Sequence, residues 1–160
     1  MFKIKELKKL LLPVLLCALL VGCDNVGFYE KTAFFPSHEW DSKEQPAFMF
    51  TITDTVSLYN IYAVVRHEDA YRYNNIWLDI TTQAPLDTAK TQKVNLQLAD
   101  NKKGWLAVGM DDIFDHRIKL TAAPIKLKSG NYTFTLKQLM REDPLTAMLN
   151  AGIRIEKTQK

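Results

Sequence analysis

Cys23 is the residue whose surroundings point most directly to a covalent reaction. It follows Leu20-Val21-Gly22, and before these residues the chain is almost wholly apolar from Leu10 onward and rich in lysine over residues 1–9. A basic segment, a short apolar run and small residues before a cleavage site are typical of a secretory signal peptide. A cysteine at that place is the thiol that bacteria link to diacylglycerol. The apolar run is too short to span a bilayer as a helix.

We therefore predict a lipoprotein signal peptide over residues 1–22 and lipid attached to Cys23. The alternatives are an ordinary signal peptide with a chance cysteine, or an uncleaved anchor. The other cysteine, Cys17, lies inside the signal peptide, so no disulfide can form within the mature chain. Two or three acyl chains such as palmitate hold a protein on a membrane far more firmly than one chain does.

The charge of the mature chain is balanced. Residues 1–22 hold four of the 21 basic residues and one of the 18 acidic residues, which leaves 17 of each sign. Binding to nucleic acid needs a concentrated excess of lysine and arginine. Nucleic acid is therefore not an expected partner.

Residues with catalytic or metal-binding side chains are scattered. The histidines lack the spacing of a metal site, and without a cysteine partner a structural zinc site is not expected. The acidic stretch Asp111-Asp112 with Asp115 lacks the glycine and the final glutamate of a calcium loop, which favours a solvated loop. None of the serines lies in a G-x-S-x-G motif. The sequence predicts no catalytic residue, no metal and no cofactor. The histidines are His38, His67 and His116.

Apolar and polar residues alternate with a period of two, which is the pattern of strands with one buried and one solvated face. Turns separate the runs, as in Asp100–Gly104 and Ser129–Asn131. Helical spacing occurs only over Leu136–Leu149, where Pro144 divides it. We predict an all-β fold, an antiparallel β-sandwich of about seven to nine short strands with one short helical segment near the C-terminus. The alternating runs are 47–53, 59–66, 76–81, 93–98, 132–136 and 153–156, with a weaker one at 118–127.

The mature chain divides into two predicted parts. Residues 23–35 lack clear periodicity and are predicted to be a lipidated tether, whose aromatic far end docks on the domain. Residues 36–160 are predicted to form the sandwich. The length suits one domain of ordinary size.

The segment from Arg66 to Trp77 has the composition of a binding surface, because tyrosine, tryptophan and arginine are enriched among interface anchors. Trp77 alternates with Ile76, Leu78 and Ile80, so its side chain is expected on the opposite face of the strand. Two interpretations stay open: an exposed partner-binding surface, or a loop whose aromatic rings cap the sandwich. The residues assigned to the surface are Arg66, Tyr71, Tyr73, Asn75 and Trp77.

A series of short motifs runs through the chain. They are Val65-Arg66-His67, Tyr71 to Leu78, Leu96 to Asp100, Gly104-Trp105 with Gly109, Tyr132-Thr133-Phe134, Leu139-Met140-Arg141, Pro144-Leu145 and Gly152 to Glu156. Their order and spacing resemble the gliding-motility lipoprotein family GldH of Bacteroidetes. With the sequence before Cys23, the resemblance covers nearly the whole chain. One departure is Leu106-Ala107 after Trp105, where the family pattern has a second glycine sooner.

The resemblance implies a lipoprotein that is not an enzyme. Its expected partners are a membrane, through lipid on Cys23, and envelope proteins of the gliding apparatus or the linked type IX secretion machinery. The alternative is a lipoprotein that binds or processes envelope polysaccharide. A coplanar, exposed strip of Tyr71, Tyr73 and Trp77 would favour sugar binding, and a cleft of converging ionisable groups would favour an enzyme.

The expected location is the cell envelope. No acidic cluster of the kind associated with surface export follows Cys23. We therefore expect the lipid in the outer membrane and the domain facing the periplasm.

Two tripeptides resemble the O-glycosylation acceptor of periplasmic Bacteroidetes proteins, which is Asp, then Ser or Thr, then a small apolar residue. They are Asp54-Thr55-Val56 and Asp87-Thr88-Ala89. Both fall where turns or loops are expected, which suits a bulky sugar. Thr55 and Thr88 are therefore candidate glycosylation sites.

The lipid assignment is testable by substitution. Cys23→Ser should abolish labelling by a fatty-acid analogue and leave the precursor uncut, because a hydroxyl does not replace the thiol as lipid acceptor. Labelling and apparent mass on a gel measure both effects. Cys17→Ser is the matched control and should be labelled and cut normally. Partition of mature Cys23→Ser protein into a detergent phase would show that the lipid assignment is wrong.

Overall fold

Alternating side chains on neighbouring strands build the faces of the core. The structure, a computed structural model, describes residues 28–158. Strand β3 (Ala47–Ile52) buries every second side chain and pairs with β12 (Gly130–Gln138), which does the same. Phe50 on β3 stacks on Tyr132 of β12, with ring centroids 5.4 Å apart. The alternation read from the sequence thus gives each strand one apolar face.

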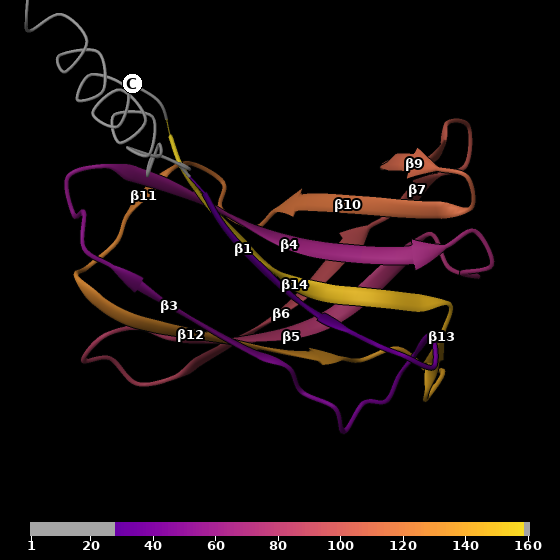
Figure 1. Ribbon diagram of the computed structural model, residues 1–160, viewed down its shortest axis with the longest axis horizontal. Helices are drawn as coiled ribbons and strands as arrows, with labels where there is room; N and C mark the ends of the chain where they lie inside the picture. Colours follow the sequence, from indigo (N-terminus) through magenta and orange to yellow (C-terminus); the bar gives the residue numbers. More distant parts are fainter. Residues whose placement is uncertain (1–27, 159–160) are drawn as a thin grey trace, which may run out of the picture.

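The strands form two facing antiparallel sheets (Figure 1). One sheet has the order β3-β12-β5-β6, and the other has the order β1-β14-β4-β10-β9, with β11 also paired to β4. Two short pairs, β13-β2 and β7-β8, complete the described part of the chain. The remaining strands are β1 (Phe28–Phe34), β2 (Glu39–Trp40), β4 (Leu58–Glu68), β5 (Asn75–Gln83), β6 (Lys90–Gln97), β7 (Ala99–Asp100), β8 (Gly104–Trp105), β9 (Val108–Met110), β10 (Ile113–Lys119), β11 (Ile125–Lys126), β13 (Leu145–Thr146) and β14 (Met148–Lys157).

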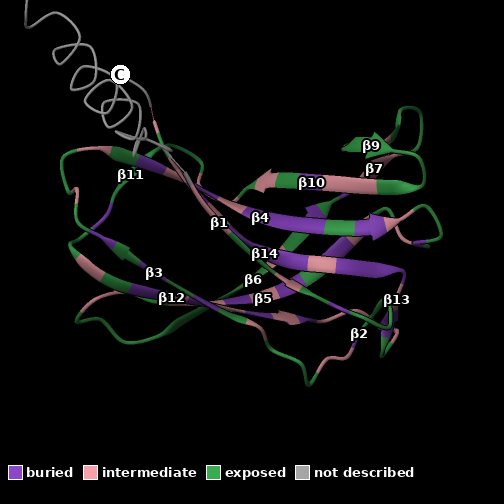
Figure 2. Cartoon of the chain, viewed as in Figure 1, coloured by how far each residue is buried: buried purple, intermediate pink, exposed green. Residues whose placement is uncertain are grey.

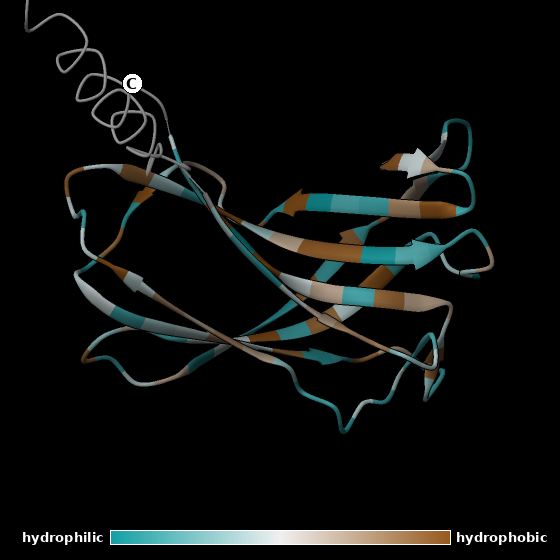
Figure 3. Ribbon diagram, viewed as in Figure 1, coloured by the Kyte–Doolittle hydropathy of each residue, from teal (hydrophilic) through white to brown (hydrophobic). Residues whose placement is uncertain are grey.

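This architecture confirms the predicted all-β, antiparallel sandwich. Each of the six alternating runs overlaps a strand, and eight of the strands in residues 28–158 have six residues or more. Buried positions concentrate where the two sheets face each other, above all along β4 and β14 (Figure 2). Both strands carry hydrophobic stretches that hydrophilic residues interrupt (Figure 3). Burial of these apolar faces is the main source of stability, at about 25 cal/mol per Å².

The predicted helix near the C-terminus is wrong. Over 136–149 the chain finishes β12, turns, forms β13 and starts β14. Within residues 28–158, no helix has the length and hydropathy needed to span a bilayer. The side chain of Gln138 provides one reason, since its Oε1 accepts the backbone N–H of Met140 at 2.7 Å. Pro144 provides another, because it has no N–H to donate within a helix. The apolar residues of this segment instead lie in β12, β13 and β14 and enter the core at different places.

The predicted tether ends earlier than residue 35. Residues Phe28–Phe34 form β1, which pairs along its whole length with β14. Phe35 is fully buried and stacks on Trp40 with ring centroids 5.1 Å apart. This segment lacks clear alternation because β1 lies at the edge of the sheet and none of its side chains over residues 29–34 is fully buried. The signal peptide and Cys23 lie outside the described residues.

Ion pairs cross the outer face of the larger sheet. Glu30 on β1 binds Arg154 on β14 and Arg117 on β10, each at 3.0 Å. Asp115 on β10 binds Arg66 on β4 at 3.0 Å and Arg117 at 3.3 Å. A single exposed pair contributes only about 0–1 kcal/mol. Here the pairs share partners, so together they link four strands from outside.

The two ends of the sandwich carry different features. Phe28 pairs with Glu156, which pairs with Asn60 on β4, so β1 begins at the end of the sandwich where β4 also begins. The loops after β4, β7, β9 and β12 lie at the opposite end, seen at the right of Figure 1. Eight residues of β4 separate Asn60 from Glu68, or roughly 25 Å at about 3.3 Å per residue. We call the end at Phe28 the tether end and the other the distal end.

Gly152 on β14 is required by the close approach of β1. A Cβ atom at this position would lie 2.2 Å from the carbonyl oxygen of Lys31 and 2.7 Å from the Cα of Thr32. Gly152→Ala should therefore push β1 off β14 and lower the free energy of unfolding by about 1–3 kcal/mol. Urea unfolding followed by circular dichroism measures the loss.

Gly109→Ala is the matched control. Its Cβ would crowd the side-chain ring of Phe114 and no backbone atom more closely than 3.7 Å. The loss should therefore be smaller than for Gly152→Ala. Equal stabilities for the wild type and Gly152→Ala would contradict the close packing of β1 on β14.

Candidate partner-binding cleft

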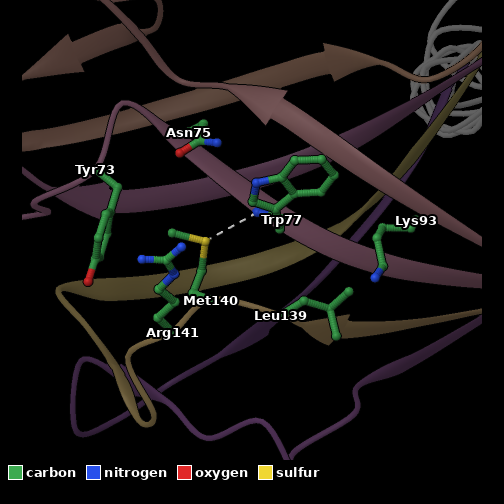
Figure 4. Close-up of a pocket in the computed structure, with 7 residues that line it drawn as sticks. All are labelled: Tyr73, Asn75, Trp77, Lys93, Leu139, Met140 and Arg141. Atoms are coloured by element: carbon green, nitrogen blue, oxygen red, sulfur yellow. Dashed lines mark hydrogen bonds between the residues drawn. The ribbon is translucent and has the colours of Figure 1, made fainter.

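A cleft of about 560 Å³ opens on the outer face of the smaller sheet near its distal end (Figure 4). Trp77 and Asn75 enter it from β5, Lys93 from β6, and the rest from the segments before β5 and after β12. On β5, Ile76, Leu78 and Ile80 point into the core, so Trp77 faces outward and is 39% exposed. The lining residues are Tyr73, Asn75, Trp77, Lys93, Leu139, Met140 and Arg141.

The segment 139–141 forms one wall because the pairing of β12 with β5 ends there. Leu139 donates its backbone N–H to the carbonyl of Trp77 at 2.9 Å, continuing the ladder by one bond. The N–H of Trp77 instead meets the sulfur of Met140 at 3.3 Å. A thioether is a weak acceptor. The strands therefore separate at Trp77 and leave room for the cleft.

Glu142 holds this wall in place. Its carboxylate accepts hydrogen bonds from Arg72 at 2.7 Å, the Tyr73 hydroxyl at 2.9 Å and the Thr146 hydroxyl at 2.7 Å. The hydrogen bond from Thr146 is the largest of several that keep the pKa of Glu142 below its ordinary value. Arg141 directly precedes Glu142 in the sequence, so the hydrogen bonds of Glu142 also hold Arg141 beside the cleft.

Three of the five residues assigned to a binding surface line the cleft. Trp77, Tyr73 and Asn75 lie together, and the prediction that Trp77 faces away from Ile76 and Leu78 is confirmed. Asn75 donates from its side-chain amide to Asn95 on β6 at 2.7 Å, which fixes its orientation. The role of these residues in binding stays a prediction.

Arg66 and Tyr71 are not part of this surface. Arg66 is exposed but lies on the larger sheet, bound to Asp115. Tyr71 is 3% exposed, so its assignment to an exposed surface is wrong. Its hydroxyl donates to the carbonyl of Asn75 at 3.0 Å, and its burial raises the pKa of the phenol. A loop residue can belong to the core when the loop folds back over the open end of the sandwich. The alternation of polar and apolar residues cannot reveal this.

Tyr71 belongs to an aromatic cluster that closes the distal end of the core. His67 contacts Tyr71, Trp105 and Phe114 with ring centroids 5.0, 4.4 and 5.7 Å apart. Trp105 donates from its indole nitrogen to Asp69 at 2.7 Å, which ties β8 to the loop after β4. The interpretation of aromatic rings capping the sandwich therefore describes Tyr71, whereas Trp77 fits the interpretation of an exposed surface.

Two histidines that are far apart in the sequence meet within this cluster. His67 and His116 are buried, with their Nε2 atoms 2.9 Å apart. His67 Nδ1 lies 2.7 Å from the carbonyl of Glu68 and must donate to it. His67 Nε2 is then the acceptor and His116 Nε2 the donor, and His116 Nδ1 has no hydrogen-bond partner in the described part of the chain. The hydrogen bond between the two Nε2 atoms has room for one proton, so the two imidazoles cannot both be charged while it is present.

Residues considered for metal binding do not converge. Within residues 28–158, no three His, Cys, Asp or Glu side chains lie close enough to share a metal ion. Asp111 and Asp112 are exposed, as expected of a solvated loop, and Asp115 is paired with arginines. His38 binds Glu68 at 2.8 Å on the surface. Thr55 and Thr88 are exposed in loops, and their glycosylation stays a prediction.

Comparison with known proteins shows to which family the chain belongs. The sequence profile described as GldH lipoprotein matches residues 27–155. The chain belongs to the GldH lipoprotein family. A gliding motility lipoprotein GldH homolog from Christiangramia forsetii is 22% identical over 147 residues, covering 88% of this chain and 90% of its own. The gliding motility lipoprotein GldH of Flavobacterium johnsoniae is 25% identical over 150 residues, covering 89% and 92%.

Membership of a lipoprotein family implies attachment to a membrane of the cell envelope, which agrees with the signal read from the sequence. Among solved structures, that of infectious bursal disease virus Gx strain aligns with 80% of this chain and 30% of its own. The identity is 10% and the TM-score 0.29, a likeness that carries no argument.

The histidine pair predicts a pH dependence of stability. Burial, then the charge of His67, lowers the pKa of His116 from 6.5 to about 4, and burial also lowers that of His67. As the pH falls below 6.5 the unfolded chain takes up protons first, so the free energy of unfolding decreases until the folded pKa is reached. Between pH 7.5 and 5, His116 alone should cost about 2 kcal/mol. Urea unfolding at both pH values measures the change.

Substitution separates the pair from other titrating groups. The double variant His67→Leu with His116→Leu should lose most of the pH dependence, whereas His38→Gln, outside the pair, should keep it. Asp54 contributes in a lower window, because a hydrogen bond with Lys157 lowers its pKa below 3.8. An unchanged slope in the double variant would contradict this assignment.

Proposed function

We propose that this protein is a lipid-anchored interaction protein of the cell envelope that serves gliding motility by binding another envelope protein in its distal cleft. The observation that carries the proposal is the position of that cleft. Trp77 and its neighbours lie near the end of the sandwich opposite Phe28, where the chain arrives from the lipidated cysteine. A membrane tether at one end leaves the other end free to meet a partner.

The composition of the cleft supports binding rather than catalysis. Its seven lining residues include aromatic, methionine and arginine side chains, which are enriched where proteins recognise each other. They include neither a carboxylate nor a histidine that could act as a general base. We therefore propose that the protein is not an enzyme.

The names of the two relatives support the link to gliding motility. One is named a gliding motility lipoprotein GldH and the other a homolog of that protein, and each match covers about nine-tenths of this chain. We extend that role to this chain, together with attachment at Cys23 to the outer membrane and a domain that faces the periplasm. The partner is then a protein of the gliding apparatus or of the linked type IX secretion machinery.

Polysaccharide binding is the alternative. A sugar platform needs a coplanar, exposed aromatic strip, and Tyr71 is buried while the hydroxyl of Tyr73 is bound to Glu142. Trp77 alone remains as an exposed ring on this face of β5. The geometry therefore supports a protein partner better than a sugar.

Photocrosslinking in the native host tests the proposal. p-Benzoylphenylalanine at position 77 should crosslink to an envelope protein of the gliding or secretion machinery, identified by mass spectrometry. The control position is Leu86, which is fully exposed in the loop between β5 and β6 near the tether end. Equal crosslinking at both positions, or none at position 77, would refute the proposal.

Stability measurements distinguish an anchor from a core residue. Trp77→Ala should reduce recovery of the crosslinked partner by full-length protein, yet cost only about 1–2 kcal/mol of stability because the ring is half-exposed. Tyr71→Ala should cost about 3–5 kcal/mol because the ring fills a buried site. Thermal unfolding of both purified variants provides the comparison. A larger loss for Trp77→Ala than for Tyr71→Ala would reverse these assignments.

A further inference from the structure

We infer that the cleft takes an extended acidic segment of its protein partner, with carboxylates toward Arg141 and Lys93 and an apolar side chain against Trp77. This inference rests on the proposed function and adds the chemistry of the ligand. The fold leaves two positive charges at the cleft without an ion-pair partner in residues 28–158.

Arg141 differs from the other arginines. Residues 28–158 contain five, and Arg66, Arg72, Arg117 and Arg154 each form an ion pair with a carboxylate. Arg141 is exposed and forms none with any residue of this described part. Arginine presents a planar fork of donors that matches a carboxylate, so an unpaired arginine at the rim of a cleft is a ready site for an anion.

The other side of the cleft is also positive. Lys93 on β6 is exposed and has no ion pair within residues 28–158. The carboxylate nearest in register is Asp79 on β5, which lies between Lys93 and Lys137 of β12. One acidic side chain therefore faces two lysines here, and this face keeps a positive balance. Complementary charge is what steers a partner to such a surface.

The floor between the two cations is apolar. Figure 4 shows Met140 and Leu139 between Arg141 and Lys93, with the ring of Trp77 beside them. Methionine and tryptophan are adaptable contacts for an apolar side chain. In an extended peptide, neighbouring side chains alternate in direction, so acidic and apolar residues can meet these two chemistries separately.

The backbone of β5 favours a peptide over a sugar. The N–H of Trp77 donates to the sulfur of Met140, where the sheet ladder would have provided a carbonyl. A peptide carbonyl is a stronger acceptor than a thioether, so a peptide that displaces the flexible Met140 side chain exchanges a weak main-chain hydrogen bond for a stronger one. An acidic sugar offers carboxylates but lacks that extended backbone. Binding of an acidic sugar is therefore tested as the competing result.

A titration with defined probes tests the inference. The first probe is a capped nonapeptide of alternating aspartate and valine, the second has asparagine in place of aspartate, and the third is hexagalacturonate. The protein is the ¹⁵N-labelled full chain with its lipid, in detergent micelles. The acidic peptide should shift the Trp77 amide and indole resonances and those of residues 139–141. The asparagine peptide should bind about tenfold more weakly.

Charge variants locate the site. Arg141→Glu and Lys93→Glu should each weaken the acidic peptide about tenfold, and Arg141→Lys should lose less, because a lysine keeps the charge without the fork. Lys103→Glu, an exposed lysine in the turn between β7 and β8, is the matched control and should bind as wild type.

Each remaining outcome overturns the inference. Equal binding of the two peptides removes the charge requirement, and resonance shifts with hexagalacturonate alone assign the cleft to an acidic sugar. An absence of shifts with every probe removes the ligand assignment. Crosslinking at position 77 reports on the proposed function separately, so a protein partner that binds without acidic selectivity leaves that proposal standing.

Discussion

The pairing of β14 between β4 and β1 brings the last strand of the domain into contact with its first, and the larger sheet depends on it. β14 follows β4 from Met148 to Lys157 and meets β1 on its other edge. Gly152 permits the close approach of β1, and the ion pairs of Glu30 cover the same rows from outside. Without a disulfide in residues 28–158, these long-range pairings and the buried faces must close the fold together.

The main strands could be predicted because one buried face leaves a clear period of two. β3 and β12 carry that pattern throughout, and β5 carries it as far as Ile80. β1 was missed because an edge strand without fully buried side chains leaves no clear alternation. The segment 136–149 misled because its apolar residues are spaced for a helix, whereas Gln138, Glu142 and Pro144 support a turn through side-chain hydrogen bonds and a missing donor.

The candidate site was predictable only in part. Trp77 could be placed by its alternation with Ile76 and Leu78, and Tyr73 by its closeness in sequence. Arg141 and Lys93 lie 64 and 16 positions after Trp77, and only the pairing of β12 and β6 with β5 brings them together. The same limit applies to His67 and His116, since pairing across β4 and β10 has no signature in either strand alone.

The direction of β1 has a mechanical consequence. β1 runs from the tether end toward the distal end, antiparallel to β14, and residues Phe28 to Phe34 all pair with that strand. A pull between Phe28 and the distal cleft acts along the strand axis. The hydrogen bonds between β1 and β14 then bear the load in shear, all at once, whereas a pull across the strands would open them one at a time. Tension along this axis therefore meets the sheet in its more resistant direction.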